Sequence, residues 1–312
     1  MSWQPCGEAA CEASSQASAI SLVVTPKDHD IGGLVVRRAL PTKERRSVGP
    51  FVFLDQMGPA VFAPGQGIDV RPHPHIGLAT ITYLFDGAIM HRDSLGYALV
   101  IRPGEINWMT AGSGIVHSER TPDAERAAGH PLFGMQAWIA LPIDQEETEP
   151  SFIHYGAEVL PEWTGAGHAV RLIAGSLDGK TSPVETLSPM FYADANLAAG
   201  GTFKLSDEHA ERALHVAAGR VEVAGRSFQA GQLVVLNRGM PVAITALEAS
   251  RVMLLGGAPL DTAPDARPNQ PRHMFWNFVS HSRERIERAK SDWKAGRFAK
   301  VPGETEFIPL PE

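Results

Sequence analysis

Most of this 312-residue chain consists of short apolar segments that end at glycine or proline. In residues 80–85, threonines alternate with apolar or aromatic side chains; Asp86-Gly87 follows, and residues 89–93 form a second such segment. A period of two is typical of a β-strand with one buried face, and Asp-Gly is a frequent hairpin turn. Successive short strands of this kind predict an all-β sandwich or barrel rather than βαβ units.

One glycine spacing occurs twice in the chain. An apolar segment lies between Gly104 and Gly112, and another lies between Gly231 and Gly239, the same number of residues apart. Such a repeat predicts two similar β-barrels in tandem. We therefore expect a flexible tail (1–19), an N-terminal barrel (20–150), a C-terminal barrel (151–264), and a linker with a C-terminal helix that packs on the barrels (265–312).

The expected C-terminal helix lies within residues 278–298. Ser280 or Ser282 can cap its first turn, and Gly296 can end it. A helical face is predicted because apolar side chains recur there at helical spacing. These side chains are Ile286, Ala289 and Trp293.

The charge balance and the cysteine count limit partners and location. The formal net charge of -7 argues against direct nucleic-acid binding and against attraction to anionic membranes. No apolar run is long enough for a transmembrane helix, and residues 1–19 hold no signal-peptide core. The two cysteines, Cys6 and Cys11, make no disulfide framework, which favours a reducing compartment and hence the cytoplasm. They could chelate metal as a pair, but thiols without a role in a tail are the simpler interpretation.

Two short motifs each hold a pair of metal-ligand side chains. His73 and His75 are separated by one residue, and so are His117 and Glu119. Residues i and i+2 of a strand project from the same face, so each pair can point to one place. Histidines at this spacing also arise by chance in ordinary strands and loops. The second pair follows Gly112 and Gly114, which would let the chain approach the site closely, and this favours a metal site.

The ligand set limits the metal and its use. Three imidazoles and one carboxylate without a thiolate suit iron(II), with manganese, nickel, copper or zinc as alternatives. An octahedral ion would keep two positions for water, substrate or dioxygen, as in a catalytic or sensing site. An ungapped comparison with the second barrel places Leu205, Asp207, Ile244 and Ala246 at the equivalent positions. We therefore expect one metal ion, in the N-terminal barrel.

The chain resembles the pirin family, of the bicupin superfamily, over nearly its whole length after the tail. This resemblance implies two cupin (jelly-roll) barrels, iron in the first barrel, and the ligands His73, His75, His117 and Glu119. The general cupin pattern has a glutamate four residues after the second histidine, where this chain has Ala79, so chemistry that needs that carboxylate is not expected. The matching segments are Arg71-Pro72-His73-Pro74-His75, His91-Arg92-Asp93-Ser94-Leu95-Gly96 and residues 108–119.

The family resemblance implies three functions to compare. The first is a quercetin 2,3-dioxygenase that cleaves flavonols with dioxygen, in which Glu119 accepts the substrate proton. The second is a metal-dependent redox sensor that binds transcription factors or metabolic enzymes, and the third is a storage or scaffold bicupin. For the first, we expect the flat substrate to contact apolar side chains near the metal, with Phe53, Trp108, Met109 and Trp138 as candidates.

Overall fold

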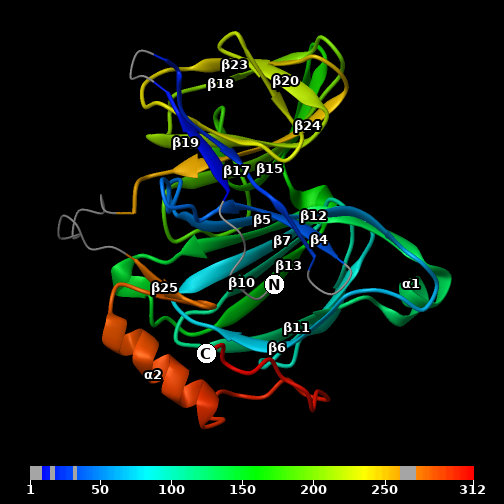
Figure 1. The fold of residues 1–312 in the computed structure, drawn as a ribbon, viewed down its shortest axis with the longest axis vertical. Helices are drawn as coiled ribbons and strands as arrows, with labels where there is room; N and C mark the ends of the chain where they lie inside the picture. Colours follow the sequence, from blue (N-terminus) through cyan, green and yellow to red (C-terminus); the bar gives the residue numbers. More distant parts are fainter. Residues whose placement is uncertain (1–8, 15–17, 31–33, 261–271) are drawn as a thin grey trace.

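The structure is a computed structural model that describes residues 9–14, 18–30, 34–260 and 272–312. Strands dominate it, and they form two β-barrels stacked one above the other, with a helix below the first barrel (Figure 1). The prediction of a tandem all-β fold followed by a C-terminal helix is therefore confirmed.

Each barrel combines one large and one small antiparallel sheet. In the first barrel, the large sheet has seven strands and the small sheet has four. The large sheet has the order β13 (Ser151–Tyr155), β10 (Ile106–Thr110), β7 (Leu78–Asp86), β12 (His130–Ala140), β5 (Phe51–Phe62), β4 (Val35–Leu40) and β3 (Asp28–Asp30). The small sheet has the order β6 (Asp69–His75), β11 (Ile115–Arg120), β8 (Ile89–Asp93) and β9 (Ala98–Ile101). The helix α1 (Asp123–Ala128) and the 3-10 turn η1 (Ile143–Gln145) connect strands of this barrel.

The second barrel has the same plan with nine and four strands. Its large sheet has the order β1 (Ala10–Ala13), β2 (Ile20–Thr25), β22 (Leu233–Leu236), β19 (Glu211–Ala218), β24 (Ser250–Gly257), β17 (Met190–Leu197), β15 (His168–Leu177) and β14 (Glu162–Gly165), and β16 (Lys180–Thr181) pairs with β15. Its small sheet has the order β18 (Thr202–Leu205), β23 (Val242–Ala246), β20 (Arg220–Val223) and β21 (Arg226–Gln229). The 3-10 turn η2 (Ala157–Val159) lies between the two barrels in sequence.

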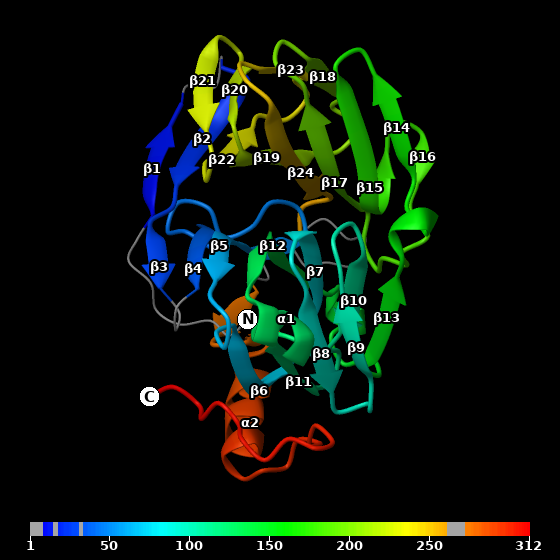
Figure 2. The same cartoon turned by 90° about the vertical axis from the view of Figure 1, so that its right-hand side faces the viewer.

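The N-terminal strands differ from the expected domain boundaries. Residues 10–13 were expected in a flexible tail, yet they form β1, which pairs with β2. Residues 20–25 were expected in the first barrel, yet β2 pairs with β22 of the second barrel (Figure 2). At the other boundary, residues 151–155 form β13, which pairs with β10 of the first barrel. Strand pairing therefore divides the chain neither at residue 20 nor at residue 150.

The two large sheets face each other across an apolar seam. Ile81 and Met135 of the first barrel belong to the same buried cluster as Ile173, Tyr192 and Leu255 of the second. Burial of this much apolar surface between two sheets is the main force that joins them. Half-buried Cys11 also packs there, as a free thiol whose pKa is raised by burial. Cys6 lies outside the described residues.

Buried polar contacts also cross the seam. The Tyr83 hydroxyl donates to Asp194 at 2.9 Å, and Asp194 also accepts two hydrogen bonds from Arg251, at 2.9 and 2.6 Å. His215 Nε2 lies 2.7 Å from Gln56 Oε1, which makes Nε2 the donor. All these groups except Arg251 are at most 2% exposed. The mostly apolar seam therefore contains a few buried polar groups, and each of them relies on a hydrogen-bond partner from the other barrel.

His215 gives the seam an acid sensitivity that can be measured. Burial lowers the pKa of His215 to about 3, with the nearby Arg37 charge as a second cause. Below pH 6.5 the unfolded chain binds a proton at this residue and the folded chain does not. Metal-free protein should therefore lose about 1.4 kcal/mol of stability per pH unit from His215 as the pH falls from 6.5 toward 3. When the free energy of urea unfolding is plotted against pH over this range, the slope for His215→Gln should be smaller than that of the wild type by the equivalent of about one proton. An unchanged slope would contradict the assignment.

The C-terminal helix begins later than its sequence range suggested. Residues 278–280 form β26 (Phe278–Ser280), which pairs with β25 (His273–Phe275), and α2 (Arg283–Lys294) follows. Ser282 caps α2, as one of the two expected alternatives, by accepting a hydrogen bond from the Arg285 amide. Ile286 and Ala289 are buried in a cluster with Ile76, next to the first barrel.

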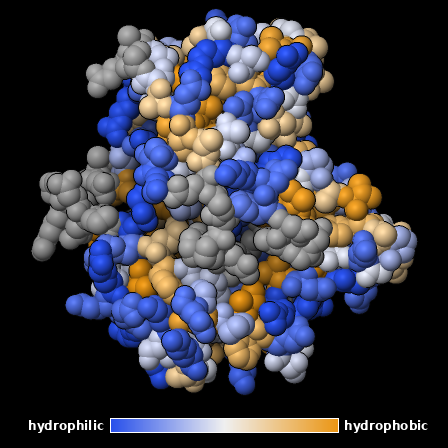
Figure 3. Space-filling model, in the orientation of Figure 1, coloured by the Kyte–Doolittle hydropathy of each residue, from blue (hydrophilic) through white to orange (hydrophobic). Residues whose placement is uncertain are grey.

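The outer surface of this region is mostly polar. Hydrophilic residues predominate over α2 at the lower left of Figure 3. Arg288 and Glu287 are exposed there, in agreement with the interpretation of a solvated helix face. Among the described residues, no helix is both long enough and apolar enough to span a membrane.

Candidate metal centre

The two ligand motifs lie on neighbouring strands of the small sheet. β6 carries His73 and His75, and β11 carries His117 and Glu119. His117 pairs directly with His73, so both side chains leave the sheet on the same face, toward the barrel interior. The prolines at 72 and 74 suit β6, because it is the edge strand of its sheet and a proline cannot donate a ladder hydrogen bond.

Three imidazoles converge inside the first barrel. His73, His75 and His117 each offer a nitrogen that lies within 4.8 Å of the other two, and all three residues are at most 1% exposed. Their ring centroids are 4.4 to 5.1 Å apart. Within the described residues, no second group of this kind is found.

The hydrogen bonding of these imidazoles fits a metal ion. Nε2 of all three rings is buried and lacks a hydrogen-bond partner, and an unpartnered buried polar atom is costly unless something binds it. His73 Nδ1 lies 2.9 Å from the Arg71 carbonyl, so Nδ1 carries the proton and Nε2 is left as the donor atom for a metal. Three such nitrogens could bind one metal ion together.

Electrostatics keep the three rings neutral. Burial lowers the pKa of His73 to about 3. Burial also lowers the pKa values of His75 and His117 well below their ordinary value, and the neighbouring rings contribute in the same direction. A metal binds neutral imidazole, so the rings are in the binding form at neutral pH without losing a proton.

Glu119 lies beside the three histidines but is not part of their compact group. It is 2% exposed, and the Thr82 hydroxyl donates to its Oε1 at 3.4 Å. The pairing of β11 with β6 changes register between His117 and Glu119, so Glu119 lies opposite Val70. The extra residue lies on β6, since β11 pairs with β8 without a shift, so the third position of the histidine series on β6 does not face the carboxylate of Glu119. Its role as fourth ligand therefore stays a proposal.

Several polar residues that border the site were not predicted from the sequence. His91 Nε2 lies 2.9 Å from Asp93 Oδ2, and the His91 ring centroid is 5.4 Å from that of His117. The Thr82 hydroxyl lies 3.0 Å from Gln136 Oε1 as well, so its single proton is shared between Gln136 and Glu119. His91 and Asp93 have the same one-residue separation as the ligand pairs, which was a usable signal. Thr82 and Gln136 had none, because they come from separate strands.

The four candidate substrate residues divide between two places. Phe53, Met109 and Trp138 are buried in one cluster inside the first barrel. Trp138 stacks on Phe53 with centroids 3.9 Å apart and meets the His75 ring edge-on at 5.1 Å. Trp108 lies in the seam cluster instead, because neighbouring residues of a strand face opposite sides. The structure thus brings three candidates together and separates Trp108 from them.

The glycines near the site act differently from what was expected. Gly112 has a φ of +50°, and an added Cβ would lie 2.0 Å from the Thr148 carbonyl oxygen. A Cβ on Gly114 would lie 2.9 Å from the Phe298 ring. Both glycines therefore allow close chain packing behind β11, rather than an approach to the metal.

The second barrel has apolar side chains at the equivalent positions. In the first barrel His117 pairs with His73 on one side and Asp93 on the other. In the second, Ile244 pairs with Phe203 and Val223. The ungapped comparison was therefore two residues off on one strand, since Phe203 and Leu205, not Leu205 and Asp207, match His73 and His75. The residues at these positions are buried in the core of the second barrel: Phe203, Leu205, Val221, Val223, Ile244 and Ala246.

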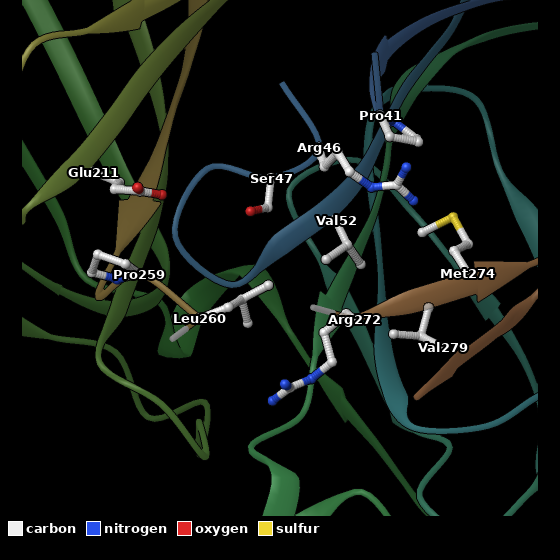
Figure 4. A pocket seen from close by; sticks show the side chains of 10 residues that line it. All are labelled: Pro41, Arg46, Ser47, Val52, Glu211, Pro259, Leu260, Arg272, Met274 and Val279. Carbon is white, nitrogen blue, oxygen red and sulfur yellow. The ribbon is translucent and has the colours of Figure 1, made fainter. Parts of the chain in front are cut away.

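A separate cavity of about 210 Å³ lies at the joint of the two barrels (Figure 4). Arg46 and Arg272 line it together with Glu211 of β19. Its apolar wall includes Val52 and Val279, which belong to the same cluster as Phe53 and Trp138. None of its lining residues is a proposed ligand, so it is distinct from the metal centre.

Comparison with known proteins identifies the family. A pirin family model matches residues 33–139, and a model of the pirin C-terminal cupin domain matches residues 192–299. A pirin-like protein of Caulobacter vibrioides is 52% identical over 94% of this chain and 100% of the relative. This chain belongs to the pirin family. The resemblance seen in the sequence motifs is thereby confirmed.

Two proteins named as quercetin 2,3-dioxygenases are also similar to this chain. A Pseudomonas aeruginosa relative, provisionally named a quercetin 2,3-dioxygenase, is 41% identical over 89% of this chain and 85% of its own length. A crystal structure of a quercetin 2,3-dioxygenase from Acinetobacter baumannii superposes with a TM-score of 0.84 at 33% identity, covering 93% of this chain and 94% of that one. The bicupin architecture of this pirin is shared with that enzyme over nearly the whole chain.

Proposed function

We propose that this pirin is a mononuclear metal oxidoreductase of the quercetin 2,3-dioxygenase type, with a flavonol and dioxygen as substrates. The main observation is a group of three buried imidazoles with unpartnered nitrogens, in contact with an aromatic wall. The names of the Pseudomonas and Acinetobacter relatives support the same reaction class.

Iron(II) is the proposed metal, held by His73, His75 and His117, with Glu119 as the fourth ligand. Imidazole and carboxylate donors without a thiolate also accept manganese, nickel, copper or zinc, so the donor set supports a group of metals. Four protein ligands would leave part of an octahedral coordination sphere open for substrate.

The residues around the centre have distinct proposed roles. A bound metal would supply Lewis acidity and a path for electrons to dioxygen. The Glu119 carboxylate would accept the proton of the flavonol 3-hydroxyl, and the Thr82 hydroxyl, which donates to Glu119, would hold that carboxylate in place. Phe53 and Trp138, stacked at 3.9 Å, would hold the flat rings and exclude water.

Turnover of quercetin tests this proposal. Iron-loaded protein is expected to consume dioxygen and form a ring-cleavage product, and His75→Ala is expected to lose at least about 100-fold in rate. His130→Ala is the matched control, because His130 is buried in the same barrel outside the ligand group. Equal turnover by the wild type and His75→Ala would remove the metal from the mechanism.

A second candidate is a metal-dependent redox sensor that binds a regulatory protein or a metabolic enzyme. The observation that favours it is the alternation of β11, in which His117 and Glu119 face the proposed metal centre while Ser118 and Arg120 contact the partly buried Glu304 of the C-terminal segment. A change of one unit of charge on a buried ion is weakly screened and could alter that contact. Pull-down with oxidised and reduced protein separates the two candidates: capture that ignores redox state and metal content argues against the sensor.

A further inference from the structure

The C-terminal segment lies against the outer face of the two ligand strands (Figure 1). β6 is the edge strand of its sheet, and its Pro72 carbonyl accepts a hydrogen bond from the Ile308 amide at 2.8 Å. The Ile76 carbonyl, one residue beyond His75, accepts from the Val279 amide at 3.2 Å. Segments that are more than 200 residues away in sequence therefore protect the free edge of the strand that supplies two ligands.

Glu304 makes the most specific of these contacts. It accepts a hydrogen bond from Ser118 Oγ at 2.9 Å, and two from Arg120, at 3.1 Å from Nε and 2.6 Å from Nη2. Its side chain is only 10% exposed, and Ser118 is fully buried. A partly buried bidentate pair of this kind has a better defined geometry than a fully exposed ion pair.

Ser118 and Arg120 are sequence neighbours of the proposed ligands His117 and Glu119. Side chains alternate along β11, so Ser118 lies between the inward-facing residues His117 and Glu119, and Arg120 follows Glu119. Glu304 therefore holds the outward-facing neighbours of both β11 residues at the centre. The aim of each inward side chain depends on the twist of the strand, and Glu304 contacts the strand from its outer face.

The rest of the C-terminal segment packs on the strands only in part, through contacts such as the hydrogen bond from Ile308 to Pro72. A cavity of about 660 Å³ lies between them, lined by Pro72 and Val116 on one side and by Trp293, Phe298 and Phe307 on the other.

We propose that Glu304 is a positioning residue for the metal centre: it acts through Ser118 and Arg120 to hold His117 and Glu119 in their binding geometry. The inference rests on the proposed metal site but needs no particular reaction. Glu306 offers a matched control, because it also contacts Arg120, at 3.2 Å, but is 59% exposed and does not contact Ser118 in any recorded hydrogen bond.

Cobalt(II) and iron(II) binding to the full chain tests the proposal. Glu304→Gln keeps the size of the side chain but removes its charge, and it is expected to raise the dissociation constant roughly 10- to 100-fold and to change the visible absorption of bound cobalt(II). Glu306→Gln is expected to change the dissociation constant by less than about twofold and to leave the spectrum unchanged. Ser118→Ala, which removes one of the three hydrogen bonds, should weaken binding in the same direction by a smaller factor.

Three outcomes separate the possible failures. If the wild type binds metal and Glu304→Gln matches it in both affinity and spectrum, the positioning role is overturned, even if the variant unfolds at a lower temperature. If Glu304→Gln does not fold, Ser118→Ala decides by the same two readouts. If the wild type binds neither cobalt(II) nor iron(II), the proposed function fails first, and the positioning role fails with it.

Discussion

His75→Ala is expected to abolish stoichiometric metal binding. Loss of a residue that merely orients a ligand typically costs 10- to 100-fold in affinity, so loss of one of three imidazole ligands should cost more than about 100-fold. The effect is large because His75 is fully buried and no protein group bonds its Nε2 in place of a metal. Metal content after loading with iron(II) and desalting measures the result, with about one ion per chain expected for the wild type.

His130→Ala is the control for general damage to the first barrel. His130 is 5% exposed and stacks on Phe62, away from the ligand group. This variant should retain the ion, and added metal should raise its unfolding temperature as it does for the wild type. Glu119→Gln should weaken binding less than His75→Ala, since its carboxylate lies outside the compact group. A full equivalent of tightly bound metal in His75→Ala would contradict the assignment of the centre.

Asp194→Ala is expected to produce the largest loss of stability, about 2 to 4 kcal/mol, because it leaves the partly buried Arg251 without its counter-charge and the buried Tyr83 hydroxyl without its acceptor. Asp194 is 1% exposed and accepts hydrogen bonds from Arg251 and from Tyr83 across the seam. Both partners lose their acceptor at once, in a region that water reaches poorly. Urea unfolding at neutral pH with metal-free protein measures the change in free energy.

An exposed ion pair of the same barrel provides the comparison. Glu162 accepts from Arg171 at 2.7 Å, but its side chain is 48% exposed. Glu162→Ala should therefore cost no more than about 1 kcal/mol. Similar losses for Asp194→Ala and Glu162→Ala would show that the seam network contributes little to the union of the two barrels.

Local patterns in the sequence were sufficient for the fold class and for the three histidines. Alternation and glycine turns are short-range features, and they predicted strands such as residues 80–85 correctly. The prediction that His73 and His75 share one face depends only on the period of a strand, so it required no knowledge of the sheet. Their meeting with His117 needed one further assumption, that the two strands are neighbours, and the pairing of β6 with β11 supports it.

Contacts between segments that are far apart in the chain could not be predicted from the sequence. The period of two shows that Trp108 and Met109 face opposite sides, but it does not show which side is the seam. Pairing of β2 with β22 joins segments more than 200 residues apart, and nothing in residues 20–25 indicates which barrel they enter. Register is also set by partners, which explains the error of two residues in the comparison of the barrels and the unforeseen bulge beside Glu119.

The pairing of β2 with a strand of the second barrel has a mechanical consequence. Within the described residues the polypeptide passes from one barrel to the other between β2 and β3, and again between β13 and β14. Two bodies joined at separate points cannot swing apart about a single pivot as two modules on one linker can. Any response of this protein to a bound metal ion would then pass through the strands and the chain termini attached to them. It would not involve a hinge motion that separates the two barrels.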